Sequence, residues 1–427
     1  MKLEIRNQKT KNEPAGFHLL ISTFCFLLSV ILMAFPQVGA FQAPEEQALT
    51  PTNFRAPDFP DQGNGLASSP SISPPTPNRN LPGAPGVSPA LPADNLPGSV
   101  WINSPPLTMG QLRGKVVLID FWEYTCINCI RTFEQNKKWY ERYHKCGFEI
   151  IGVHDPEFDI AYHAANVRTA VKRFGLPYPV FVDPNFRLWQ AYHNDSWPSR
   201  FLVDSKGVVR FHKDGEGGDA AFEHAIQRFL LESHPGLKFP SDYTIGPEPD
   251  ALAPSCGVPT QEMYVGHWFD RGILSNREGY HNGKTIRYEL PANINDGQAG
   301  VSGWWETDKN GMIYRGKHND AITGPDRLVM RYHARELYAV INVSHGRPSA
   351  VYIQQDGKDL TAADKGVDVK FDAQSHSYVE VQEPRMYYLV QNPAFGAHTV
   401  TLTPAKPGLT IDSFTFGNDC QTRFPHL

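Results

Sequence analysis

Apolar residues recur in two different patterns along the chain, and the change of pattern divides it into two folded regions. Over residues 99–235, short β-branched apolar runs alternate with segments whose apolar residues recur three and four positions apart, which predicts alternating strands and helices. Over residues 260–427 only short runs between turn residues recur, which predicts an all-β domain. Pro-rich and Gly-rich stretches at 41–98 and 236–259 are interpreted as linkers, the first of them disordered.

The first folded region predicts an α/β sheet with helices on both sides, in the order strand, helix, strand, helix, strand, strand, helix. Strands are expected at residues 115–122, 148–153, 179–182, 201–203 and 208–211, the last two forming a hairpin around the turn at 204–207. Helices are expected at residues 129–143, at 167–174, and from Asp219 onward, where the aspartate is a favourable N-cap.

The second folded region predicts many short strands and no long helix. The regular turn signals between the strands favour an antiparallel sandwich or jelly roll. The expected strands are residues 284–290, 328–332, 337–343, 349–354, 367–371, 377–381, 386–390, 399–403 and 410–416.

The N-terminal 40 residues carry an export signal. An apolar block at residues 17–35 follows several basic residues and precedes Val38-Gly39-Ala40, a small-x-small cleavage pattern. A signal peptide cleaved after Ala40 is one interpretation, and an uncleaved anchor in the inner membrane is the other, because the block is nearly long enough to span a bilayer. Both predict that the rest of the chain is periplasmic or secreted.

Composition narrows the class of protein. Of 427 residues, 41% are hydrophobic, which excludes wholesale disorder. Six cysteines in so long a chain exclude a small disulfide-stapled scaffold. The 40 basic and 45 acidic side chains give a net charge of −5, so no basic field exists to hold nucleic acid non-specifically.

The chemistry of the chain is predicted at Cys126-Ile127-Asn128-Cys129, which follows the first strong strand and opens the first helix. Zinc sites use the same spacing, but no second Cys or His pair follows at zinc-finger distance, so neither metal nor cofactor is expected. A thiol at a helix N-terminus is favoured as the thiolate, the attacking species in disulfide exchange. Cys126 is therefore expected to be the exposed nucleophile, and Cys129 the partly buried thiol that resolves the mixed disulfide.

Several motifs around this pair resemble one family. Residues 117–129 (VLIDFWEYTCINC) resemble a thioredoxin active-site segment. Together with residues 101–107, 152–158, Trp197-Pro198 and 215–217 they are similar to the extracytoplasmic TlpA/DipZ-type branch of thioredoxin-like proteins. Residues 385–390 and 414–417 resemble the β domain that follows thioredoxin in DipZ-type proteins, a jelly roll like that of carbohydrate-binding modules.

The resemblance implies a thiol:disulfide oxidoreductase, favoured as a reductase, that acts on protein disulfides and is recharged by an unidentified thiol reductant. It implies that Asp120, buried beneath the cysteines, exchanges a proton with Cys129; a satisfied strand-end carboxylate is the alternative. Pro198 matches the family's cis-proline, which lies opposite the two cysteines. Trp122 and Trp197 are expected to form apolar walls around the exposed sulfur, although Trp122 could equally pack in the core.

Four glutamates lie in or near these motifs without a place in the predicted catalytic set. Glu123, beside the cysteines, would raise the cost of forming a thiolate, or it could be solvated. Glu157 and Glu216 lie in matched motifs but suggest no mechanism. Glu134 stands where the family's helix usually has a proline, which predicts that the kink in that helix is absent or softer.

The remaining cysteines and tryptophans have predicted roles of their own. Cys256 and Cys420 bracket the β domain and could form a structural disulfide, whereas Cys146 is expected to be a buried structural thiol. Trp268, Trp304 and Trp305 could form a platform for sugar rings, although core aromatics are the commoner explanation. Two alternative functions follow: a glycan- or protein-binding scaffold, and a thiol peroxidase, although Cys126 lacks the Pro-x-x-x-Thr-x-x-Cys setting of such enzymes.

Overall fold

The computed structural model of the chain describes residues 100–239, 257–267, 273–316, 324–343 and 347–418. The predicted export segment, the predicted Cys256–Cys420 disulfide and Trp268 lie outside these residues. Among the described residues, no helix is long and apolar enough to cross a membrane. We call residues 100–239 the α/β region and the described residues from 257 to 418 the all-β region.

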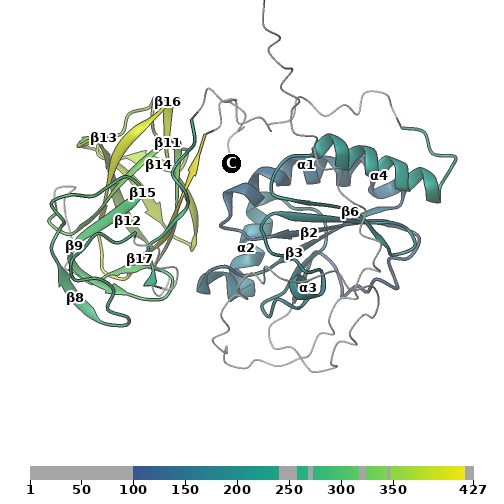
Figure 1. The fold of residues 1–427 in the computed structure, drawn as a ribbon, viewed down its shortest axis with the longest axis horizontal. Coiled ribbons are helices and arrows are strands. Elements are labelled where there is room, and N and C mark those ends of the chain that lie inside the picture. The colour runs from purple at the N-terminus through teal and green to yellow at the C-terminus, as the bar shows by residue number, and fades with distance from the viewer. Residues whose placement is uncertain (1–99, 240–256, 268–272, 317–323, 344–346, 419–427) are drawn as a thin grey trace, which may run out of the picture. The chain divides into compact units, whose positions relative to one another are not determined.

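A six-stranded mixed sheet in the order β1-β4-β3-β2-β5-β6 forms the centre of the α/β region (Figure 1). Strands β2, β3 and β4 are parallel, and β1, β5 and β6 join antiparallel to their neighbours. The strands are β1 (Val100–Ile102), β2 (Val116–Trp122), β3 (Phe148–His154), β4 (Val180–Val182), β5 (Ser199–Val203) and β6 (Val209–Asp214). The helices are α1 (Ile127–Tyr143), α2 (Ala164–Phe174), α3 (Arg187–Ala191) and α4 (Asp219–Ser233), with short 3-10 turns η1 (His144–Cys146) and η2 (Asp159–Tyr162).

Alternation along β2 assigns its side chains to the two faces of the sheet. Val116, Leu118 and Trp122 pack with buried residues of α1, α2 and α4. Val117, Ile119 and Phe121 pack with α3 on the other face. Because side chains alternate along a strand, Asp120 lies on the same face as Trp122, under α1. The predicted alternation of strands and helices is thus confirmed, but the three expected helices lie on one face and α3 lies on the other.

Two details of the α/β region differ from expectation. The short elements β1 and α3 were not expected, since three and five residues are too few to show a period. Asp219 was expected to be the N-cap of the last helix, but it is the first residue of α4, and Gly218 takes the cap position in a left-handed conformation with φ of 68°. The Asp219 carboxylate instead pairs with the fully buried guanidinium of Arg200, 2.8 Å away.

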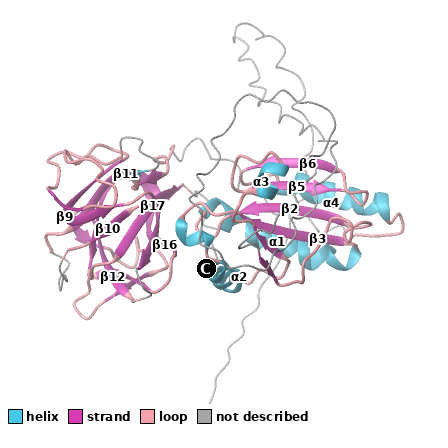
Figure 2. Ribbon diagram, turned by 90° about the horizontal axis from the view of Figure 1, so that it is seen from below, coloured by secondary structure: helices cyan, strands magenta, loops and turns pink. Residues whose placement is uncertain are grey.

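The all-β region is built on one 11-stranded antiparallel sheet, which Figure 2 shows as strands joined by loops. Its path runs β14-β15-β12-β16-β11-β17-β10-β9-β8, with β13 paired to β12 and β7 to β17. The strands are β7 (Met263–Tyr264), β8 (Thr285–Tyr288), β9 (Gln298–Thr307), β10 (Met312–Tyr314), β11 (Arg327–Val343), β12 (Ser349–Gln355), β13 (Lys358–Asp359), β14 (Val369–Phe371), β15 (Ser377–Val381), β16 (Arg385–Pro404) and β17 (Leu409–Gly417).

Two pairs of expected strands merge into single long ones. Residues 328–332 and 337–343 both lie in β11, and 386–390 and 399–403 both lie in β16. The two strands pair with each other, and their register shifts between Ala334 and Glu336. A bulge of this kind lets a strand bend without ending, so the polar residues that look like a turn in the sequence continue the strand.

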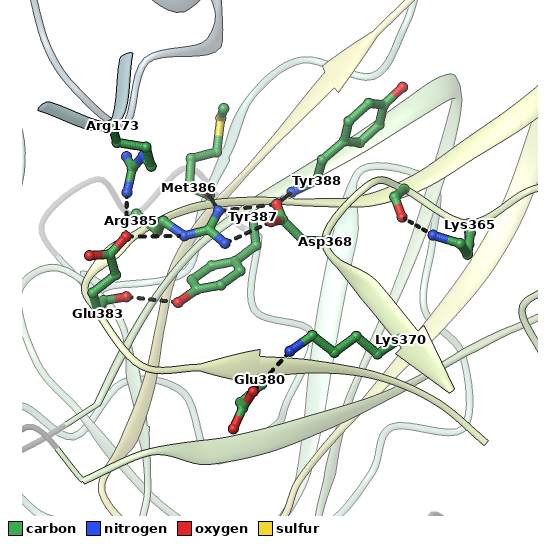
Figure 3. A network of polar contacts seen from close by, with 11 residues as sticks. Arg173, Lys365, Asp368, Lys370, Glu380, Glu383, Arg385, Met386, Tyr387 and Tyr388 are labelled. Carbon is green, nitrogen blue, oxygen red and sulfur yellow. Dashed lines mark hydrogen bonds and ion pairs between the residues drawn. The ribbon is translucent and has the colours of Figure 1, made fainter. Parts of the chain in front are cut away.

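The motif at the start of β16 is held by a polar network, drawn in Figure 3. The Arg385 guanidinium donates to both oxygens of Asp368, at 2.6 and 3.1 Å, and lies over the Tyr387 ring. The backbone N–H of Tyr388 donates to the same carboxylate, and the Tyr387 hydroxyl donates to the Glu383 carbonyl. A bidentate arginine pair fixes geometry as well as charge, so this network anchors the β16 start against the loop before β14.

Candidate active site

Cys126 and Cys129 lie where β2 passes into α1. Cys126 is the N-cap of α1, with extended backbone angles, and its sulfur accepts a hydrogen bond from the Cys129 N–H at 3.3 Å. Cys129 is fully buried, whereas Cys126 keeps some contact with solvent. Both are free thiols. The geometry therefore gives one thiol that an incoming group can reach and a second thiol directly beneath it.

The surroundings of the two thiols oppose their ionisation to different extents. Burial raises the pKa of Cys126, the Cys129 N–H opposes that rise, and the carboxylates of Glu157 and Glu262 add to it. Burial also raises the pKa of Cys129 well above its usual range, with further contributions from the hydrogen bond to Cys126 and the charge of Asp120. Burial thus opposes the thiolate that the helix N-terminus is expected to favour at Cys126, while the Cys129 N–H supports it.

Asp120 is fully buried, and its charge contributes to the raised pKa of Cys129. One carboxylate oxygen accepts a hydrogen bond from the Asn136 side chain at 2.8 Å. Burial raises the pKa of Asp120 to about 7, although the positive charge of Arg200 and the Asn136 hydrogen bond act in the opposite direction. A carboxyl group with such a pKa exchanges its proton near neutral pH, which a general acid or base requires.

Asn136 is a site residue that the sequence analysis missed. It lies seven residues after Cys129, two helical turns along α1, and is fully buried. A polar residue on the apolar face of an amphipathic helix is the signal that could have found it, since buried polar groups need partners.

Glu123 is fully buried, which excludes the alternative of a solvated side chain. Its carboxylate accepts hydrogen bonds from the backbone N–H and the hydroxyl of Thr125, and its backbone carbonyl accepts from the Cys126 N–H. His154 at the end of β3 lies 3.7 Å from the same carboxylate and stacks on Tyr124. These contacts fix the loop that presents Cys126.

The tryptophans near the pair occupy different environments. Trp122 is fully buried and packs edge-on against Phe133 and His154, so it belongs to the core that supports the site. Trp197 is half-buried and packs on Trp189, with ring centroids 4.5 Å apart. The peptide bond between Trp197 and Pro198 is cis. Both Cys126 and Trp197 pack against the same buried cluster.

Other candidates lie apart from this site. Cys146 ends η1 and is partly exposed rather than buried. Trp305 is fully buried and donates to the Ser302 carbonyl, so it cannot stack on a sugar, whereas the neighbouring Trp304 is 47% exposed.

Glu134 is exposed on a helix that continues unbroken from Ile127 to Tyr143. In the described part of the chain, no group of three or more potential ligands is arranged for a metal ion.

Two protein families match this chain, one in each of its two regions. Residues 102–212 match the AhpC/TSA family, and residues 260–417 match the family described as thioredoxin like C-terminal domain. The chain therefore combines a thioredoxin-like fold with a C-terminal all-β domain, as the resemblance implied.

Individual relatives extend the comparison. The chain is 32% identical to protein DipZ of Mycobacterium tuberculosis over 323 residues, which are 74% of this chain and 41% of that protein. It thus spans about two fifths of that relative. It is 26% identical to thiol-disulfide oxidoreductase YkuV of Bacillus subtilis over 134 residues, which are 31% of this chain and 89% of YkuV. A thiol-disulfide isomerase from Corynebacterium glutamicum is a similar solved structure, at 25% identity, with a TM-score of 0.29, 31% of this chain and 90% of that chain covered.

Proposed function

We propose that this chain is a thiol:disulfide oxidoreductase that uses Cys126 and Cys129 to reduce or exchange protein disulfides. One observation carries the proposal. The sulfur of the partly exposed Cys126 accepts a hydrogen bond from the Cys129 N–H, and the Cys129 thiol is fully buried. Relatives named as thiol-disulfide oxidoreductases, YkuV of Bacillus subtilis and ResA of Geobacillus thermodenitrificans, support the same reaction class.

In the reductive direction the reaction has two steps. The Cys126 thiolate attacks one sulfur of a substrate disulfide, forming a mixed disulfide and releasing the other sulfur as a thiolate that takes up a proton. Cys129 then loses its proton and attacks the Cys126 sulfur. The second substrate thiol leaves, and the chain holds a Cys126–Cys129 disulfide. Two electrons have passed from the pair to the substrate.

Asp120 is the group proposed to accept the Cys129 proton in the second step. The case rests on its burial on the face of the sheet under α1, on its pKa of about 7, and on the influence of its charge on the Cys129 thiol. A buried thiol with a strongly raised pKa needs such a base, because its thiolate is costly to form in the absence of water.

The proposed reaction takes place outside the cytoplasm. The apolar block at residues 17–35, preceded by basic residues, supports export of everything that follows. Substrates would be proteins with accessible disulfides, and a thiol reductant would return the pair to its reduced state. Pro198 and Trp197, joined by a cis peptide bond, and the loop at Glu123, whose carbonyl accepts a hydrogen bond from the Cys126 N–H, are the proposed contact residues for substrate.

Reduction of insulin by the full chain, with dithiothreitol as electron donor, tests this function. Cys126→Ser is expected to abolish turnover, and Cys129→Ser to accumulate a mixed disulfide at Cys126. Cys146→Ser is the matched control, since it removes a thiol outside the site, and it is expected to retain full activity. Unchanged activity in Cys126→Ser would overturn the proposal. Consumption of hydrogen peroxide at a higher rate than insulin reduction would favour the peroxidase alternative instead.

A further inference from the structure

Glu157, a motif residue that the reaction does not use, contacts the all-β region beside Cys126. It follows β3, and its carboxylate accepts a hydrogen bond from the hydroxyl of Tyr264 on β7. The same hydroxyl lies 2.9 Å from the carboxylate of Glu262. The Tyr264 ring packs against Phe158, with centroids 5.9 Å apart, and Tyr264 belongs to the buried cluster against which Cys126 packs. We call Glu157, Tyr264 and Glu262 the carboxyl–phenol triad.

The number of protons in this triad follows from its hydrogen bonds. A phenol has one hydrogen and can donate it to only one of two carboxylates. The other carboxyl group can share a hydrogen bond with the phenol oxygen only when it carries its own proton. Burial and the nearby charges of Glu262 and Glu123 raise the pKa of Glu157 well above its usual range, which is the direction that retaining a proton requires.

We propose that Tyr264 and Glu262 are positioning residues of the redox site, supplied by the all-β region, and that the triad holds one proton that limits the negative charge facing Cys126. This inference rests on the proposed function and assigns a role to the second domain in it. With the proton bound, the triad carries one negative charge. Without the proton it carries two, and the Cys126 thiolate becomes harder to form.

The other charged groups near Cys126 are already paired within the described structure. Arg131 on α1 contacts Glu216 and Glu336, and Glu123 lies against His154 and Thr125. The second oxygen of Glu262 accepts a hydrogen bond from the Thr415 hydroxyl at 2.9 Å. Asp159, two residues after Glu157, pairs with Lys309. These contacts hold Glu262 in place. The triad and Asp120 are then the groups whose protonation changes the charge near the two thiols, with the triad acting on Cys126 and Asp120 on Cys129.

The pH dependence of Cys126 alkylation in the reduced full chain tests this proposal, with iodoacetamide as the probe and the labelled peptide quantified by mass spectrometry. Glu262→Gln leaves a single carboxylate, so the second negative charge cannot form. Alkylation is expected to match the wild type where the triad holds its proton, and to exceed it several-fold at the higher pH where the wild-type triad has lost that proton. Tyr264→Phe keeps the ring on Phe158 but removes the hydrogen bond that lowers the pKa of Glu157, so the carboxyl pair holds its proton to higher pH and the profile is expected to shift to lower pH. Glu380→Gln is the matched control, because that carboxylate pairs with Lys370 on the exposed surface of the same region (Figure 3).

The result that would overturn the proposal is a pair of profiles for Glu262→Gln and Tyr264→Phe that both coincide with the wild type. If Tyr264→Phe fails to fold, the Glu262→Gln profile decides alone. Insulin reduction measured on the same samples separates this outcome from failure of the proposed function. Coincident profiles with Cys126-dependent insulin reduction would reject the triad and retain the oxidoreductase, whereas insulin reduction that does not depend on Cys126 would reject the function itself.

Discussion

Replacing Asp120 with asparagine removes a fully buried carboxyl group whose pKa burial raises from 3.8 to about 7. The unfolded chain releases this proton near pH 4, whereas the folded chain holds it until about pH 7. Over that window the unfolded state binds fewer protons, so the contribution of Asp120 to the free energy of unfolding falls as pH rises. A pKa raised by this amount lowers the free energy of unfolding by about 4 kcal/mol above pH 7, relative to its value near pH 4.

The Asp120→Asn variant lacks this titration. Its stability relative to the wild type is therefore expected to increase by up to about 4 kcal/mol between pH 4 and pH 8. The altered hydrogen bond to Asn136 adds an offset of about 1 kcal/mol that is the same at every pH, so the slope with pH is the informative quantity. In parallel, the rate of insulin reduction is expected to fall by about 100-fold, since the base for Cys129 is lost.

Hydrogen exchange of the backbone amides in β2 measures the free energy of opening at the strand that carries Asp120. Wild type and Asp120→Asn are compared in the same buffers from pH 4 to pH 8, after correction for intrinsic exchange. A stability difference that stays constant within about 1 kcal/mol over this range would refute the assignment of a raised pKa to Asp120. A pH-dependent difference with an unchanged insulin rate would refute its role as the base.

Three further outcomes are expected. Arg200→Met removes a buried guanidinium that pairs with Asp219 and lies over Phe222, and is expected to cost about 3 kcal/mol, seen as a lower thermal midpoint of the α/β region. Asp412→Asn removes a buried carboxyl group whose pKa burial raises to about 8, so hydrogen exchange in β17 is expected to slow, relative to wild type, as pH rises from 4 to 9. Trp305→Ala empties a fully buried site in the all-β core, and is expected to cost about 4 kcal/mol in denaturant unfolding.

Local pattern predicted the α/β region well because its strands are short buried β-branched runs. The whole of β2 is buried, and the four buried residues of α2 are those whose spacing predicted the helix. The pattern failed where tertiary contacts outweigh propensity. The local sequence favours Asp219 as the cap of α4. In the folded chain its carboxylate instead pairs with the buried guanidinium of Arg200, because a buried charge without a partner is strongly destabilising.

In the all-β region, pattern found separate short strands where two long ones exist. Glu336 interrupts the apolar alternation of β11, yet it is buried, because the hydroxyls of Tyr338 and Tyr388 donate to its carboxylate and Arg131 pairs with it. Tyr338 lies two residues away on the same strand, but Tyr388 and Arg131 are distant in the sequence and cannot be identified from it.

The residues of the candidate site also differ in whether the sequence alone could predict that they lie close together. Cys126, Cys129 and Asp120 lie within ten residues of one another, and their spacing on a strand and a helix is enough to bring them together. Tyr264 and Glu157 are separated by 107 positions, and only the folded chain places them side by side. Sequence resemblance marked Glu157 as a motif residue, but its chemistry depends on a tyrosine and a glutamate from the other region.

The most direct test of the central claim is a redox titration of the full chain in glutathione buffers, with the disulfide state of each cysteine read by mass spectrometry. The account predicts one reversible two-electron transition, in which Cys126 and Cys129 form a disulfide with each other and Cys146 stays reduced. Substituting either Cys126 or Cys129 with serine is expected to abolish that transition. A chain in which these two cysteines remain reduced under oxidising conditions, or in which Cys126 pairs with another cysteine instead, would contradict the account.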